Sequence, residues 1–133
     1  RWTKPVLSKE NEVTLKRLIF PGEEITAIAE GMFEKIEVVG MVALPWELEK
    51  MGDYVFAKSK IGILKIYPDA LKSQYGRQFK GATIDKLFLP ESSLPMSCSE
   101  LGLLRSIVVN ASVKEVILDE SVHMSWEDFV KQV

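Results

Sequence analysis

A repeat with a period of about 23 residues constrains this chain more than any other feature of its sequence. A large apolar residue is followed by others three and five positions later, and this pattern starts at positions 15, 39, 61 and 84. A proline follows each copy within two residues, at positions 21, 45, 68 and 90. Twelve or thirteen residues after each copy comes Phe33, Phe56, Phe79 or Leu101. Because these independent features stay in phase from copy to copy, the repeat is not an accident of a 47% hydrophobic composition.

Each part of the repeat has a direct physical interpretation. Segments such as LIF (18–20) and LFL (87–89) alternate as a short strand does, with the outer residues of the triplet on one face. Proline lacks the N–H that continues a central ladder, so we expect it to end the strand. The segment that follows mixes apolar residues with glycine and charges, which predicts an irregular return or one helical turn. Such units bury their apolar faces only when stacked, so the sequence predicts a solenoid with one short-stranded sheet.

Two looser copies of the pattern follow, LRSIVV at 104–109 and VKEVIL at 113–118. Their starts are nine residues apart, which is too close for a full turn of a solenoid. Two possibilities stay open: either the second segment folds back beside the first, or one of the two lies outside the main sheet.

The segments ITAIAEGMFEK (25–35) and LEKMGDYVFAKSKIGILKIYPDAL (48–71) resemble the BspA-like bacterial leucine-rich repeat family. The match covers about residues 14–101 and continues more loosely to 118. This resemblance implies an α/β repeat fold, a right-handed solenoid of four to five leucine-rich repeats with irregular or short-helical returns. It also implies an extracellular or bacterial cell-surface protein that binds other proteins, although the sequence itself shows no secretory signal.

The whole chain, 1–133, is expected to form a single leucine-rich-repeat domain. Residues 1–13 would be an N-terminal cap or linker, residues 14–118 the repeats, and residues 119–133 a C-terminal cap. Within the last segment, Ser125 is a suitable helix N-cap, and Asp128 stands three residues later. Apolar residues then fall on one helical face, which predicts a short capping helix: Trp126, Phe129, Val130 and Val133.

Charge and residue inventory disfavour most chemistry. The net charge is −2, with no basic excess for nucleic acid, and the longest apolar runs are far shorter than the roughly 20 residues that span a bilayer. One cysteine, Cys98, permits no internal disulfide. Asp119, Ser121 and His123 could be composed into a catalytic set, but nothing fixes a nucleophile or an oxyanion hole. We therefore expect no catalytic residue, no metal ligand and no cofactor.

The outward side of the predicted strands is the first candidate binding surface. Strand alternation places eight residues there: Arg17, Ile19, Met41, Ala43, Ile63, Lys65, Lys86 and Phe88. This face is commonly polar in the resembling family, whereas here it is unusually apolar, which favours a binding or self-association surface. Two alternatives stay open: the N-terminal stretch 2–11 covers this face, or the register slips by one residue.

Aromatic residues beside the strands are a second candidate. Trp46 follows one repeat proline and Tyr67 precedes another, so both could contact a partner. These features predict a non-enzymatic scaffold that recognises a protein partner. The alternatives are a carbohydrate-binding module that uses the exposed aromatic residues, and a structural module that self-associates through the open sheet.

Overall fold

The computed structural model describes residues 14–20, 25–119 and 121–133, which form a β-solenoid of about three turns. Its main sheet has seven strands in the order β1–β4–β6–β7–β8–β9, with β2 also paired to β4. The pairs are parallel except that of β8 with β9. The strands of this sheet are β1 (Thr14–Leu15), β2 (Leu18–Ile19), β4 (Glu37–Ala43), β6 (Lys60–Lys65), β7 (Thr83–Phe88), β8 (Ser112–Asp119) and β9 (Val122–Ser125).

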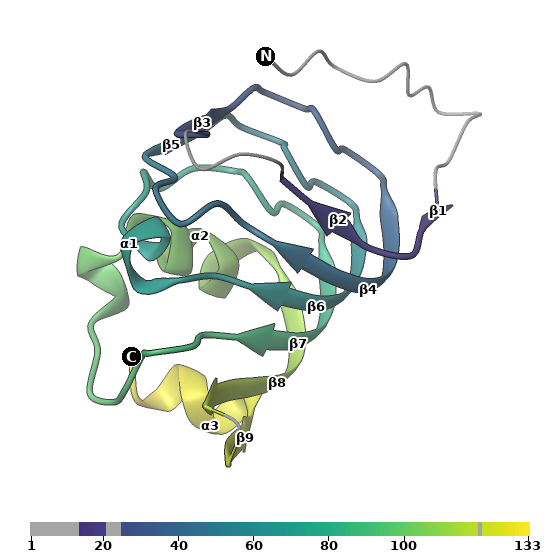
Figure 1. Cartoon of the computed structure of the whole chain (residues 1–133). Helices are drawn as coiled ribbons and strands as arrows, with labels where there is room; N and C mark the ends of the chain where they lie inside the picture. Colours follow the sequence, from purple (N-terminus) through teal and green to yellow (C-terminus); the bar gives the residue numbers. More distant parts are fainter. Residues whose placement is uncertain (1–13, 21–24, 120) are drawn as a thin grey trace.

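The remaining elements lie in the returns and at the C-terminal end. A second, two-stranded parallel sheet pairs β3 (Ala27–Ile28) with β5 (Lys50–Met51). The helices are α1 (Pro68–Leu71), the 3-10 turn η1 (Cys98–Glu100), α2 (Gly102–Asn110) and α3 (Trp126–Lys131). Figure 1 shows the strands of the main sheet stacked as successive rungs, with α1 and α2 in two of the returns opposite this sheet and α3 beneath β8.

The sheet register advances in equal steps at the start of the strands, where successive partners are Thr14, Glu37, Lys60 and Thr83. The steps then become unequal, because residues 38–41 of β4 lie opposite residues 61–63 of β6, which leaves one extra residue in β4. This β-bulge explains why the apolar repeat takes a longer step into β4 than out of it. At the bulge, a Cβ on Gly62 would overlap the carbonyl oxygen of Val39, so the close approach of the strands depends on glycine.

A left-handed backbone position recurs with the same period, at the end of each return. Lys35, Lys58 and Gly81 have φ angles of 64°, 56° and 73°, and each stands two residues before a strand of the main sheet. The repeat therefore turns into its strand through one recurring backbone geometry, and only the last of the three copies uses glycine for it.

The core runs along the inside of the turns, and its register is as the sequence predicts. All eight residues expected to point inward are buried: Leu18, Phe20, Val42, Leu44, Leu64, Ile66, Leu87 and Leu89. The one-residue slip therefore does not occur. The aromatic positions of the returns stack on one another, with ring centroids 5.5 Å apart between Phe33 and Phe56 and 5.4 Å apart between Phe56 and Phe79.

The segment LRSIVV does not form a strand. Residues 104–109 lie in α2, and Leu103, Leu104 and Ile107 on one side of this helix are buried. VKEVIL instead belongs to β8, the next rung after β7, so the possibility that one segment lies outside the sheet is the correct one. The solenoid has about three turns, fewer than the four to five repeats that the sequence predicts.

The C-terminal helix is confirmed. The Ser125 side chain accepts a hydrogen bond of 3.1 Å from the backbone N–H of Asp128, and it caps α3 at the expected position. Phe129 is fully buried, which fixes the helix over the last rung. Strands β4, β6 and β7 each end two or three residues before a repeat proline, as expected. Pro21 and the predicted N-terminal cap, residues 1–13, lie outside the described residues.

Candidate functional site

The outward side of the sheet carries the eight residues that strand alternation predicts, and we call this set the outer sheet face. Its members form two rows across the strands, because partners in the register lie side by side. One row contains Met41, Ile63 and Lys86, and the other contains Ile19, Ala43, Lys65 and Phe88. Arg17 is exposed next to β2. Ile19 is 57% exposed, a large value for an isoleucine in a sheet.

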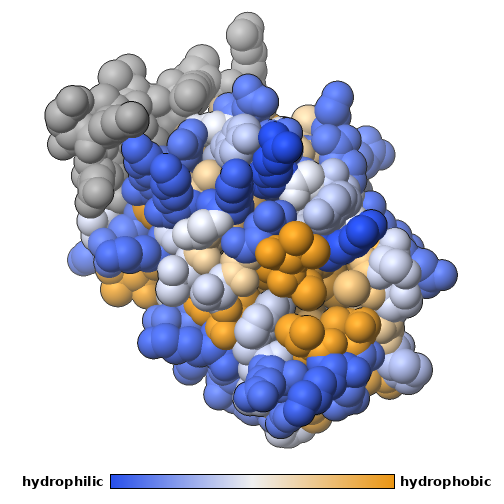
Figure 2. Space-filling view, turned by 180° about the vertical axis from the view of Figure 1, so that it is seen from behind, coloured by the Kyte–Doolittle hydropathy of each residue, from blue (hydrophilic) through white to orange (hydrophobic). Residues whose placement is uncertain are grey.

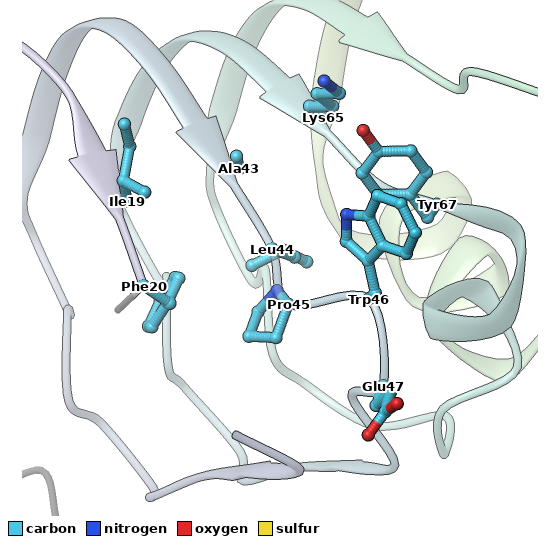
Figure 3. A pocket seen from close by; sticks show the side chains of 9 residues that line it. All are labelled: Ile19, Phe20, Ala43, Leu44, Pro45, Trp46, Glu47, Lys65 and Tyr67. Carbon is cyan, nitrogen blue, oxygen red and sulfur yellow. The ribbon is translucent and has the colours of Figure 1, made fainter. Parts of the chain in front are cut away.

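A hollow of about 550 Å³ lies where β2, β4 and β6 end. Nine described residues line it: Ile19, Phe20, Ala43, Leu44, Pro45, Trp46, Glu47, Lys65 and Tyr67. Figure 3 shows Ile19 and Phe20 on one side and the rings of Trp46 and Tyr67 on the other, with the chain from Ala43 to Pro45 between them. The fold thus joins the two candidates, since three residues of the outer sheet face and both predicted aromatic residues line one hollow.

The aromatic wall of the hollow is a small cluster. The ring centroids of Trp46 and Tyr67 are 4.6 Å apart, and Trp46 is 66% exposed. The ammonium group of Lys65 lies 5.0 Å from the centroid of Tyr67 and 5.7 Å from that of Phe88. These cation–π contacts hold the lysine head over the rings at the upper end of the hollow.

The structure separates some of the predicted residues from this hollow. Arg17, Met41, Ile63 and Lys86 do not line it, and Phe88 reaches it only through its contact with Lys65. The sequence interpretation missed Glu47, whose signal was its position next to Trp46. It also missed the continuation of the row of Lys65 and Phe88 onto Ile117 of β8 and His123 of β9, because it placed no strand with certainty after residue 89.

Asp119, Ser121 and His123, the three residues considered as a catalytic set, lie at the turn between β8 and β9. Nδ1 of His123 lies 3.2 Å from Oε1 of Glu115 across the β8–β9 pair. The Asp119 carboxylate accepts hydrogen bonds from the backbone N–H and the hydroxyl of Ser121 and from the N–H of Val122, and it thereby organises the turn. These bonds, those of Ser121 first, lower the pKa of Asp119 below its ordinary value of 3.8.

Other kinds of site find no support in the part of the chain that the structure describes. There, no group of three or more His, Cys, Asp or Glu side chains is placed to hold a metal ion. Within the same residues, no helix has both the length and the apolar character needed to cross a membrane.

Figure 2 shows a gathering of apolar side chains on the face opposite to the view of Figure 1.

The fold defines the class of this protein, a β-solenoid. Comparison of the chain with protein-family models, with curated proteins and with solved structures gave no match.

Proposed function

We propose that this chain is a non-enzymatic recognition module that binds a protein partner through the outer sheet face, with the hollow as its anchoring site. The observation that carries the proposal is the position of Trp46. Its large side chain is 66% exposed beside a hollow, at the end of paired strands. Exposed aromatic residues at the rim of a preformed hollow are typical of binding hot spots.

The lining of the hollow favours a protein over a glycan. Ile19, Ala43 and Pro45 present apolar surface, and among the described lining residues only Trp46, Glu47, Lys65 and Tyr67 carry polar side-chain atoms. An apolar side chain of a partner could be buried against this surface, and few polar groups would be left without a hydrogen-bond partner. The hydroxyl groups around the edge of a sugar ring would find side-chain partners only on these four residues.

The kind of repeat protein and its location are also part of the proposal. The period of the repeat, the strand register and the stacked phenylalanines agree with the resemblance to BspA-like leucine-rich repeats. We assign the chain to that kind of protein, exported or displayed on a bacterial surface. An intermolecular contact through the same face, between copies of the chain, is the competing use of this surface.

Selection from a random-peptide display library tests the proposed function. Peptides that bind the wild-type chain should bind Trp46→Ala and Ile19→Ala about tenfold more weakly. Val109→Ala is the matched control, because Val109 is 58% exposed on α2 and does not line the hollow. Peptides that bind all three variants as well as wild type would contradict the proposal.

The carbohydrate alternative rests on the same pair of rings, Trp46 and Tyr67, which could stack on a pyranose. Glycan-array binding that disappears in Trp46→Ala, together with failure of the peptide selection, would favour it. Light scattering separates the third possibility, since a self-associating module would form oligomers that Ile19→Ala weakens.

A further inference from the structure

We infer that the partner segment is acidic: a peptide with a large apolar side chain that enters the hollow and a carboxylate beside it that pairs with Lys65. This inference rests on the proposed function and specifies the chemistry of its partner. It is carried by the charges around the hollow and by the state of the Lys65 head group.

Lys65 holds a positive charge with no negative partner among the described residues. Its ammonium group contacts the rings of Tyr67 and Phe88, and no described carboxylate lies within 4.0 Å of it. Among the described lysines, Lys72 and Lys114 pair with Asp69 and Asp85, so Lys65 is distinguished by its position over two rings. The ring contacts also restrict the lysine head to one place, so a carboxylate that binds it would lose less entropy in ordering the side chain.

The rest of the outer sheet face has the same sign. Its eight residues include Arg17, Lys65 and Lys86 and no acidic residue. The row of Met41, Ile63 and Lys86 continues onto Glu115 of β8, the register partner of Lys86, and Oε1 of Glu115 lies 3.2 Å from Nδ1 of His123. A partner that carries carboxylates would therefore meet Lys65 and Lys86, one in each row, and Arg17 next to β2, whereas a basic partner would be repelled by them.

The hollow itself gives the ligand a direction. Glu47 carries the only carboxylate among the described residues that line the hollow. Figure 3 shows Glu47 and Lys65 at opposite ends of the hollow. Between them lie the rings of Trp46 and Tyr67 and the apolar floor at Ala43 and Pro45. A segment would place its apolar side chain against the rings and its carboxylate toward the Lys65 end, away from Glu47.

Fluorescence anisotropy with three peptides tests the inference. The three peptides are Gly-Glu-Glu-Phe-Glu-Glu-Gly, its analogue with Lys in place of every Glu, and its analogue with Ser in place of Phe. All three carry the same uncharged dye. The wild-type chain should bind the acidic Phe peptide at least about tenfold more tightly than it binds either analogue. Addition of about 0.5 M salt should weaken this binding. Equal affinity for the acidic and basic Phe peptides, or no binding of the acidic one, would overturn the inference.

A charge reversal makes the test specific to Lys65. Lys65→Glu should lower affinity for the acidic Phe peptide at least tenfold and raise affinity for the basic one above the wild-type value. Lys80→Glu is the matched control, because Lys80 is exposed in a return and changes the net charge equally. Should Lys65→Glu fail to fold, Lys65→Met keeps the aliphatic stem and should still lose the preference for the acidic peptide.

The two proposals fail in distinguishable ways. Display-selected peptides that need Trp46 and Ile19 but bind regardless of charge would overturn the acidic partner and leave protein recognition intact. Failure of the display selection itself counts against protein recognition.

Discussion

The hydroxyl of Ser106 on α2 lies 2.7 Å from the side-chain oxygen Oε1 of Gln78, and both residues are fully buried. The same hydroxyl lies 2.7 Å from the carbonyl oxygen of Gly76, and the Gln78 amide donates to the carbonyl oxygen of Met51 at 3.1 Å. This network links the return that contains α2 to the two turns before it. It supplies, through side chains, the connection that a ladder of backbone hydrogen bonds gives the earlier returns.

Ser106→Ala should lower the free energy of unfolding by about 1–3 kcal/mol, because it leaves Oε1 of Gln78 buried without its donor. Urea denaturation followed by circular dichroism measures the change. Ser93→Ala is a suitable control, since Ser93 is exposed and should tolerate the loss of its hydroxyl. Equal midpoints for the two variants would show that the network does not hold α2 in place.

Phe56→Ala should cost about 3–5 kcal/mol, because Phe56 is fully buried between the rings of Phe33 and Phe79. The same substitution at half-buried Phe88, on the outer sheet face, should cost less than about half as much. Thermal unfolding of both variants gives the comparison. An unchanged Tm for Phe56→Ala would contradict the stacked arrangement of the repeats.

The recurrent left-handed position predicts opposite effects of two substitutions. Lys58→Gly should stabilise the protein by up to about 1 kcal/mol, because glycine adopts a φ of 56° without the steric cost that lysine carries. Gly81→Ala, at a φ of 73°, should destabilise it by a similar amount. Chemical denaturation of the pair measures both, and effects of the same sign would contradict the proposed equivalence of these positions.

Asp119 should contribute stability above pH 3.8 that is lost as pH falls through its lowered pKa. The sign follows from its hydrogen bonds: the donors on Ser121 and Val122 favour the carboxylate in the folded chain and have no such effect in the unfolded one. Carbon-detected NMR titration should give a midpoint below 3.8. Ser121→Ala should raise the midpoint of Asp119, but the backbone donors should keep it below the ordinary value. A wild-type midpoint at or above 3.8 would contradict the turn geometry.

The periodic part of the fold could be predicted from the sequence because it is local and repeated. A strand's alternation, its terminating proline and its returning phenylalanine recur together, so the register of Val42, Leu64 and Leu87 followed from their spacing alone. Ser125 likewise marked the start of α3, since a cap acts on the residues that follow it directly.

The departures from the repeat could not be predicted with the same means. Leu104 and Ile107 satisfy the strand pattern and also have helical spacing, and only burial against the neighbouring turn decides between them. The chain from Thr83 to its register partner Ser112 is longer than the preceding turns, and this extra length was a signal, since it leaves room for a helix in that return. The contact of Lys65 with Phe88 joins two strands through space, and no local pattern in the sequence indicates it.

Protein NMR gives the most direct test of recognition through the hollow. Amide chemical shifts of the ¹⁵N-labelled wild-type chain are recorded while a display-selected peptide is added. We predict that the largest shifts belong to Ile19, Ala43, Trp46, Lys65 and Tyr67, and that Trp46→Ala needs about tenfold more peptide to reach them. Shifts concentrated on α2, α3 or β9 instead would contradict it.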